Sequence, residues 1–474
     1  MIVPVPDHID PAEALGYVHF VGIGGAALSG LARIMVSRGV GVTGSDATAS
    51  AMLDSLRGVG VQCWVGHDAS HVEGADTVVV STAVPGDNPE VRRALELGLR
   101  VWPRSAAVQS VLLGKTAVVV TGTHGKTTTT SMLTTALLWC GADPSYAIGS
   151  TLIASGLNAH DGAGDIFVAE GDESDGAILV YTPAAAVITN VDADHLDHFG
   201  SVASYARVFD DFLGRLRPGG FVICCVDDLG AARLATTATR RGIEVIRVGR
   251  SAAVDLRADA LTFQAETSRF EVWEGNRRRG VVGLRVPGAH YASDALAALA
   301  AGLRLGFGFD DLAAGLATFR GSGRRMEFKG DVGGVRVYDA YAHHPTEIAA
   351  DLNAARGLTG GGRLIVCFQP HLYSRTRIFG AAMGEALSAA DEVVVMDVYA
   401  ARERPEPGIS GATVAAGVPE LAGRVTYEPD RSRVAARVAD RAFPGDLVLT
   451  LGAGDVTTIG PEVLELLHLK TKET

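Results

Sequence analysis

Residues 116–130 read Thr-Ala-Val-Val-Val-Thr-Gly-Thr-His-Gly-Lys-Thr-Thr-Thr-Thr, and this stretch decides how the rest of the chain is interpreted. The β-branched run 118–121 predicts a buried strand that ends at Gly122, and residues 125–127 begin a segment with a helical pattern. A strand, a glycine turn and a helix in this order predict a phosphate-binding loop, in which backbone N–H groups surround the phosphates. In such loops the lysine, here Lys126, reaches the β- and γ-phosphates, and the next residue, Thr127, binds Mg²⁺. We therefore predict that the chain binds ATP.

The length and composition are typical of a large α/β protein. A chain of 474 residues is too long for one hydrophobic core and predicts about three domains. Apolar residues make up 47% of the sequence, and 58 glycines allow many tight turns between strands and helices. Apolar runs predict strands at residues 17–22, 78–84, 166–170, 185–190, 221–224, 334–339, 363–368, 392–397 and 446–451. Their alternation with helical segments predicts parallel sheets in three blocks, at residues 1–115, 116–321 and 322–474.

Charge, the N-terminus and the cysteines exclude several classes of protein. The 42 basic and 54 acidic residues give a net charge of −12, which argues against a nucleic-acid partner. The first residues contain no basic region and no sustained apolar stretch, and the apolar run 295–303 is too short to span a membrane. We therefore expect a cytoplasmic protein without membrane insertion. Five cysteines without a paired spacing predict small buried apolar residues rather than a disulfide framework or a zinc site.

A second glycine-rich turn follows the first predicted strand. Residues 22–27, Gly-Ile-Gly-Gly-Ala-Ala, match a dinucleotide fingerprint with Ala27 as the third small residue, and Asp46 follows at the distance of a ribose-binding acid. Taken alone, this pattern favours a nicotinamide-dependent oxidoreductase. The pattern specifies only that a diphosphate can approach a helix N-terminus, so any nucleotide diphosphate fits it equally well. An oxidoreductase would also leave the ATP-type loop without a role.

Two polar stretches follow buried strands in the central block. The first, 169–175, contains four carboxylates, which would repel one another unless a cation or hydrogen-bond donors lie among them. A Mg²⁺ site meets this need, since hard cations take carboxylate and phosphate oxygens together; a solvated acidic turn is the alternative. The second stretch, 189–198, contains His195 and His198, whose spacing is compatible with zinc. The neighbouring carboxylates and the absence of thiolates favour a Mg²⁺ and phosphate environment instead.

The third block has polar groups where two predicted strands end and helices begin. His343 and His344 follow the first of these strands, and Arg375 and Arg377 follow the second. Arginines in such a position suit a carboxylate or a phosphate, which they bind through two parallel hydrogen bonds. The alternative for the two arginines is the exposed start of a surface helix.

Taken together, these motifs resemble the Mur ligase family over essentially the whole chain and in the family's order. The usual phosphate loop has a glycine where this chain has Val120, and the shorter form 122–128 is typical of this group of ATP-dependent ligases. The other matching segments are residues 22–25, 170–175, 194–195, 324–325, 343–347 and 368–371. The run 368–376, Phe-Gln-Pro-His-Leu-Tyr-Ser-Arg-Thr, is most similar to the branch that adds L-alanine. A recycling branch, which adds a whole murein tripeptide, shares the histidine pair and remains an alternative.

The resemblance implies a fold and a reaction. It implies a Rossmann-like N-terminal domain for a UDP-linked substrate, a central ATPase-type domain with a parallel sheet, and a C-terminal Rossmann-like domain. It implies that ATP converts the carboxylate of UDP-N-acetylmuramate to an acyl phosphate, which the amine of L-alanine attacks to give the amide, ADP and phosphate. This reaction belongs to peptidoglycan precursor synthesis, and the enzyme is expected as a monomer or homodimer.

The resemblance also implies roles for individual residues. The catalytic residues would be Lys126, His195, His344 and Arg375. The ATP-binding residues would be Gly122, Thr123, His124, Gly125, Lys126, Thr127, Thr128, His290 and Arg325. The uridine nucleotide would contact Gly22, Gly24, Gly25, Ser45 and Asp46, and Mg²⁺ would be held by Thr127, Glu173 and His195.

Several positions depart from the family's usual residues, including an Ala and a Leu within residues 25–29 where Gly and Met are common. Tyr291 and Asp294 stand where asparagines are common, Ala340 replaces an aspartate, and Leu372 replaces an arginine. Because Lys126, Glu173 and His195 are all present, we expect an active enzyme. The remaining alternative is a protein that binds a nucleotide without catalysis.

Overall fold

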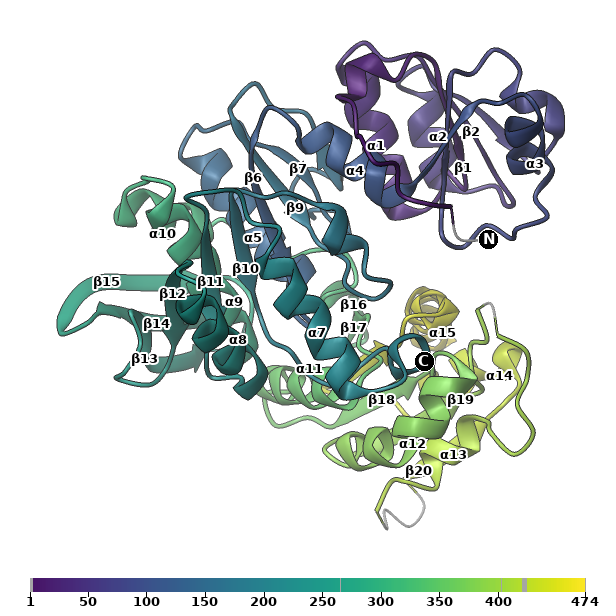
Figure 1. Ribbon diagram of the computed structural model, residues 1–474. Helices are drawn as coiled ribbons and strands as arrows, with labels where there is room; N and C mark the ends of the chain where they lie inside the picture. Colours follow the sequence, from purple (N-terminus) through teal and green to yellow (C-terminus); the bar gives the residue numbers. More distant parts are fainter. Residues whose placement is uncertain (1–2, 265, 402, 420–423, 474) are drawn as a thin grey trace. The chain divides into compact units, whose positions relative to one another are not determined.

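The computed structural model describes residues 3–264, 266–401, 403–419 and 424–473. The chain forms two compact units. The first comprises residues 1–259, 272–280 and 294–318, and the second comprises residues 260–271, 281–293 and 319–474. Three sheets, in which most strand pairs are parallel, confirm the predicted α/β class (Figure 1). The three predicted block boundaries stay a prediction.

The first sheet has five parallel strands in the order β3-β2-β1-β4-β5. Its strands are β1 (Val18–Val21), β2 (Val42–Asp46), β3 (Gln62–Val65), β4 (Thr77–Val80) and β5 (Arg100–Pro103). The helices of this part are α1 (Ala26–Ser37), α2 (Ala51–Arg57), α3 (Pro89–Glu96) and α4 (Arg104–Leu112), with two 3₁₀ turns, η1 (Ala12–Ala14) and η2 (Ala69–Val72). The strand order reverses direction at β1, and the carboxyl end of such a strand is where open α/β sheets bind ligands.

The second sheet has the order β15-β14-β13-β12-β11-β10-β6-β9-β7-β8. Its strands are β6 (Thr116–Thr121), β7 (Ser145–Ala147), β8 (Ala159–His160), β9 (Ile166–Glu170), β10 (Ala185–Ile188), β11 (Phe221–Cys225), β12 (Glu244–Gly249), β13 (Leu256–Gln264), β14 (Thr267–Glu274) and β15 (Arg277–Leu284). The helices are α5 (Lys126–Trp139), α6 (Leu196–Phe199), α7 (Val202–Leu213), α8 (Leu229–Arg240), α9 (Ala289–Arg304) and α10 (Phe309–Leu316), with the 3₁₀ turn η3 (Ala177–Val180). Strand β6 pairs in parallel with β9 and β10, so the ends of all three strands meet at one edge.

The third sheet lies in the second unit and has the order β16-β17-β21-β18-β19-β20. Its strands are β16 (Glu327–Val332), β17 (Val335–Ala340), β18 (Leu364–Phe368), β19 (Glu392–Met396), β20 (Val425–Glu428) and β21 (Leu447–Leu451). The helices are α11 (Pro345–Leu358), α12 (Tyr373–Leu387), α13 (Gly411–Ala415), α14 (Arg431–Ala439) and α15 (Ile459–Glu473), with the 3₁₀ turn η4 (Asp455–Thr458). Within the described part of this sheet, β16 and β17 pair antiparallel and the other neighbouring strands pair in parallel.

The predicted strand at residues 78–84 is too long. Strand β4 ends at Val80, and the N–H of Val84 donates to the carbonyl of Ser81 at 3.1 Å, which closes a turn. The apolar residues of this segment therefore belong partly to a loop. Four of the cysteines, Cys63, Cys224, Cys225 and Cys367, are buried, as predicted, and Cys140 is half-buried. Among the described helices, none combines the length and hydropathy that a membrane span requires.

Candidate active site

The predicted phosphate loop joins strand β6 to helix α5, as Figure 1 shows. Two glycines make its path possible. Gly122 has a φ of 138°, and Gly125, the residue before the helix, has a φ of 80°. A Cβ added to Gly125 would lie 2.6 Å from Oδ1 of Asp294, so both the backbone conformation and the space require glycine. Thr128, in the first turn of α5, is buried.

Lys126 folds back over its own loop. Its Nζ donates to the carbonyls of Gly122 at 2.7 Å and Thr123 at 2.9 Å. The same atom forms an ion pair with Oε2 of Glu173 at 2.9 Å. The ammonium group is therefore held between two carbonyls of the loop and the carboxylate of Glu173.

Glu173 is a fully buried carboxylate at the end of β9. The hydroxyl of Tyr205 donates to its Oε1 at 3.2 Å, and Nε2 of His195 lies 3.7 Å from the same atom. Burial raises the pKa of Glu173 to about 7, although Lys126 opposes this shift. The loop lysine and this carboxylate thus come together from two neighbouring strands.

The acidic stretch 169–175 is neutralised by groups of the protein itself. Oε1 of Glu170 accepts from the hydroxyl of Thr127 at 2.9 Å. Arg104 donates to Asp172 at 2.9 Å and lies 3.4 Å from Asp175. Burial alone would raise the pKa of Asp172, but Arg104 holds it well below its usual range. Arg104 therefore offsets the charge of Asp172 and Asp175, whereas Glu170 accepts from the neutral hydroxyl of Thr127 and the N–H of Gly149.

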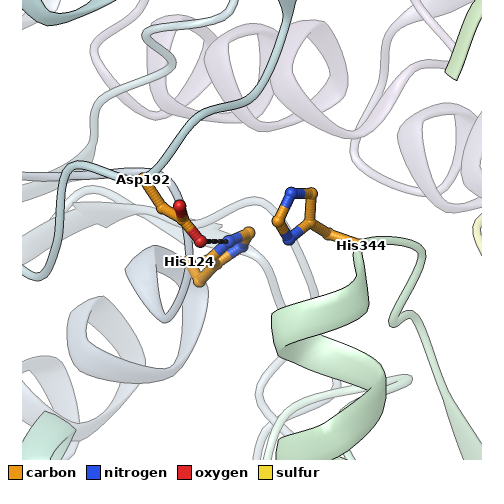
Figure 2. Close-up of side chains that lie close together, drawn as sticks. All are labelled: His124, Asp192 and His344. Atoms are coloured by element: carbon orange, nitrogen blue, oxygen red, sulfur yellow. Dashed lines mark ion pairs between the residues drawn. The ribbon is translucent and has the colours of Figure 1, made fainter. Parts of the chain in front are cut away.

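His124 and Asp192 lie together beside the loop, and the dashed line in Figure 2 joins His124 Nε2 to Asp192 Oδ2 at 3.5 Å. The N–H of His124 donates to Oδ1 of Asn190 at 2.8 Å, and its carbonyl accepts from Nδ2 of the same amide at 3.0 Å. Thr123 extends the network, because its Oγ1 lies 2.9 Å from the hydroxyl of Tyr205. The residues after β10 thus hold the phosphate loop in shape.

His195 and His198 do not share a site. His195 has a φ of 52° and precedes α6, with Nε2 lying 3.7 Å from Oδ2 of Asp194. The ring of His198 is exposed and packs edge-on against Phe199, with ring centroids 4.6 Å apart. The zinc interpretation of this histidine pair therefore has no geometric support.

In the N-terminal glycine turn, Asp46 and Ser45 form hydrogen bonds within the protein. Gly22 has a φ of 85°, and Gly25 precedes α1. The N–H of Gly24 donates to Oδ2 of Asp46 at 2.9 Å, so this carboxylate binds the turn itself. Ser45 is fully buried, and its hydroxyl donates to Oε2 of Glu90 at 2.6 Å. The Ser45 side chain is therefore committed to the protein interior.

In the second unit, His290 lies with Nε2 3.9 Å from Oδ1 of Asp351. Burial lowers the pKa of His290 to about 4, with Arg325 adding to the shift. Burial also raises the pKa of Asp351 to about 7. The guanidinium of Arg325 lies 5.3 Å from the ring centroid of Tyr341, a cation–π arrangement. His290 and Arg325 were both predicted to contact ATP, and although they are far apart in the sequence, both lie near the half-buried Asp351.

His344 and Arg375 begin two helices of the second unit. His344 precedes α11, accepts from the N–H of Thr346 at 3.4 Å, and packs edge-on against Phe379 at 4.9 Å between centroids. It is the third side chain in Figure 2. Arg375 is buried in the first turn of α12, which contradicts the alternative that it marks an exposed surface helix. Arg377, in contrast, is exposed and forms an ion pair with Glu406, with Nε 3.1 Å from Oε1.

Two residues that contact the candidate site, Tyr205 and Arg104, escaped the sequence analysis. Tyr205 joins Thr123 to Glu173, and Arg104 neutralises the acidic stretch. Tyr205 lies on the apolar face of α7, where its spacing is that of a core residue. Arg104 directly follows strand β5, and a charged residue at a strand end could have been recognised as a candidate site residue. No sequence pattern, however, linked Arg104 to carboxylates about 70 residues later.

We expect Gly125→Ala to abolish tight nucleotide binding and to lower the melting temperature. The left-handed backbone strains any other residue by about 1–3 kcal/mol, and the added methyl would also collide with Asp294. Gly141→Ala is the matched control, because Gly141 ends the same helix with a φ of 73° in open space. The control should lose stability only. Equal nucleotide affinity in the two variants, measured by calorimetry with ATP, would contradict the role of Gly125.

Comparison with known protein families finds matches along most of the chain. The Mur ligase family catalytic domain matches residues 17–116, the Mur ligase middle domain residues 120–302, and the Mur ligase glutamate ligase domain residues 324–454. A UDP-N-acetylmuramate–L-alanine ligase of Nocardioides is 58% identical over 98% of this chain and 100% of its own length. A second ligase of that name, from Acidothermus cellulolyticus, is 52% identical over 97% of this chain and 96% of its own.

The fold agrees with a solved structure of similar length. The crystal structure of a UDP-N-acetylmuramate–alanine ligase from Thermotoga maritima matches with a TM-score of 0.82 at 26% identity. The match covers 96% of this chain and 99% of that one. The three successive sheets described above are thus arranged along the chain as in a complete enzyme of this kind.

Proposed function

The chain belongs to the Mur ligase family, and on that basis we propose that it joins L-alanine to UDP-N-acetylmuramate while ATP is converted to ADP and phosphate. The observation that carries this proposal is the 58% identity to a ligase of that name over 98% of this chain and 100% of that ligase. The Lys126–Glu173 pair at the phosphate loop supplies the chemistry that an ATP-dependent ligase needs. The product would be a peptidoglycan precursor, made in the cytoplasm by a monomer or a homodimer.

The reaction has two steps. An oxygen of the muramyl carboxylate attacks the γ-phosphorus of ATP, the bond to the β-phosphate oxygen breaks, and an acyl phosphate and ADP result. The neutral amine of L-alanine then attacks the acyl carbon to form a tetrahedral intermediate. This intermediate expels phosphate and loses a proton to give the amide. Both steps concentrate negative charge on oxygens, so groups that stabilise this charge supply most of the catalysis.

Lys126 is the group placed to stabilise the transferring phosphoryl. Its Nζ lies among the carbonyls of the loop and is not committed to a single partner. When ATP enters, the γ-phosphate oxygens can replace these carbonyls as acceptors, and the lysine charge then opposes the charge that develops in transfer. Gly122, Gly125 and the first N–H groups of α5 shape the cradle around the phosphates.

The residues near Lys126 fit a Mg²⁺ ion. Glu173 is a buried carboxylate beside the phosphate loop, and carboxylate oxygens are ligands that Mg²⁺ takes together with phosphate oxygens. Thr127 and His195 complete the set that would hold the ion, together with phosphate oxygens. When bound, Mg²⁺ would neutralise part of the phosphate charge.

The roles of the other residues stay predictions. Gly22, Gly24, Gly25 and Asp46 would receive the uridine nucleotide, and Ser45 would act through its backbone, because its side chain is buried. The predicted ATP contacts of Thr123, His124, Thr128, His290 and Arg325 and the predicted substrate contacts of His344 and Arg375 are each testable by single substitution.

The deciding experiment is phosphate release with ATP, Mg²⁺ and UDP-N-acetylmuramate, with either L-alanine or the L-alanyl-D-glutamyl-diamino acid tripeptide as the amine. We expect release that requires L-alanine. Release that requires the tripeptide would assign the chain to the recycling branch of the family. No release with either amine would refute the proposed activity and would favour a protein that binds nucleotide without catalysis.

We expect Asp294→Asn to tighten ATP binding by about fivefold to tenfold, because it removes about 1 kcal/mol of repulsion between a carboxylate and the triphosphate. Asp294 is buried, and its Oδ1 accepts from the hydroxyl of Thr129 at 3.1 Å, one turn into α5. The asparagine can accept the same hydrogen bond without the charge. Asp310→Asn removes an equal charge from the exposed first turn of α10 and should leave the KM for ATP unchanged. A KM for ATP that does not fall in Asp294→Asn would show that this carboxylate does not face the phosphates.

A further inference from the structure

A buried carboxylate lies inside the first sheet domain, away from the phosphate loop. Glu90, in the first turn of α3, has no exposed surface. His71 Nδ1 lies 2.6 Å from its Oε1, and His67 Nδ1 lies 3.0 Å from its Oε2. His19 Nε2 approaches Oε1 at 3.8 Å. Burying a charged carboxylate among three histidines costs desolvation free energy, and apolar residues of similar volume usually stabilise the fold at least as well.

One partner of Glu90 connects it to the glycine turn. The hydroxyl of Ser45 donates to Oε2 of Glu90 at 2.6 Å and lies 3.0 Å from Nδ1 of His67. Ser45 is near the carboxyl end of β2. Its carbonyl accepts from the N–H of Gly22 at 2.8 Å and from the N–H of Ile23 at 3.0 Å. The residue that donates a hydrogen bond to Glu90 is therefore Ser45, the same residue whose carbonyl holds the start of the glycine turn.

The next residue continues this arrangement. Oδ2 of Asp46 accepts from the N–H of Gly24 at 2.9 Å. Ser45 and Asp46 together thus accept hydrogen bonds from three successive N–H groups, those of residues 22–24. This glycine turn determines where helix α1 begins. The first N–H groups of a helix have no partner within it and form a ready site for an anion.

We propose that Glu90 is a positioning residue for nucleotide binding, which holds Ser45 and thereby sets the glycine turn that receives the diphosphate of UDP. The inference rests on the proposed function, because that function supplies a uridine nucleotide for this turn. Glu90 itself, fully buried, would not touch the ligand. The histidines keep its carboxylate charged and oriented: burial would raise its pKa, but interactions with His19, Ser45 and His71 lower it to about 2.

The test is calorimetric binding of UDP to the full chain in four forms: the unchanged protein, Glu90→Gln, Ser45→Ala and Glu96→Gln. Ser45→Ala removes the connecting hydroxyl and leaves the bonds from the histidines to Glu90 in place. We expect the Kd for UDP to rise about tenfold in Glu90→Gln and in Ser45→Ala. Glu96 lies on the same helix and forms an exposed ion pair with Arg93 at 3.4 Å, so its variant should bind UDP normally.

Steady-state kinetics separates positioning from a general loss of structure. In Ser45→Ala the KM for the UDP-linked substrate should rise, while kcat and the KM for ATP stay the same. Unchanged UDP affinity in folded Ser45→Ala would overturn the inference, even if Glu90→Gln fails to fold. A fall in kcat with all KM values unchanged would overturn it as well, since that is the signature of fewer folded molecules. An unchanged protein that does not bind UDP would refute the nucleotide assignment itself and the inference with it.

Discussion

Lys126→Ala is expected to lower kcat by about 10³- to 10⁵-fold, the range found when a charge-stabilising group is removed from phosphoryl transfer. Lys126 is the ammonium group that the structure holds against the phosphate loop, bonded to the carbonyls of Gly122 and Thr123. Without Lys126, Glu173 would be a buried carboxylate with no ion-pair partner. Its uncompensated negative charge would then lie where the phosphates must bind. We therefore expect the KM for ATP to rise together with the fall in kcat, as measured by phosphate release.

Lys115→Ala is the matched control for this change. Lys115 is the residue before β6 and donates to the carbonyls of Gly162 and Gly164, at 3.3 and 2.6 Å. Its loss removes the same charge from the same unit and should cost stability but leave kcat near its normal value. Near-normal turnover in Lys126→Ala, or an equal loss in both variants, would contradict the role assigned to Lys126.

Glu173→Gln is expected to lower kcat by about 10²- to 10³-fold, a loss comparable to removal of one preorganised electrostatic group. The amide keeps the size of the side chain and can still accept from the hydroxyl of Tyr205. It cannot balance the charge of Lys126 or serve as a charged ligand for a cation. We therefore expect the variant to need a higher Mg²⁺ concentration for half-maximal phosphate release.

Asp175→Asn provides the comparison for Glu173. Asp175 belongs to the same acidic stretch and lies 3.4 Å from Arg104, which also pairs with Asp172. Its substitution should change neither kcat nor the Mg²⁺ requirement by more than a few-fold, since Arg104 keeps its second partner. If Glu173→Gln behaves like Asp175→Asn, the metal role proposed for Glu173 is wrong.

The phosphate loop could be predicted from the sequence because its parts are contiguous. The β-branched run, the two glycines and the Lys-Thr pair occupy one short stretch, so local preferences alone decide the strand, the turn and the helix. The same reasoning applies to the strand-and-turn pattern of Gly22 to Gly25. The α/β class followed from the alternation of apolar runs and helical segments, and the three sheets confirm it.

The partners of these motifs were not predictable in the same way. The acidic stretch was interpreted through its own four carboxylates, whereas the group that neutralises Asp172 and Asp175 is Arg104, the first residue of helix α4. Tyr205 has the spacing of a core residue, yet its hydroxyl bonds to Glu173. Ser45 was expected at the nucleotide, but its hydroxyl lies in the core against Glu90.

The sequence by itself therefore determined where the chain has its two glycine turns, which we predict to bind nucleotides, and which side chains carry charge there. Only the tertiary structure decided which of those charges meet. Lys126 pairs with Glu173 because β6 lies beside β9 in the sheet, although 47 positions separate the two residues. Local backbone preferences act over a few residues, whereas the order of strands in a sheet depends on how all the apolar faces are buried together. The polar contacts at the strand ends follow from that order, and no short pattern contains it.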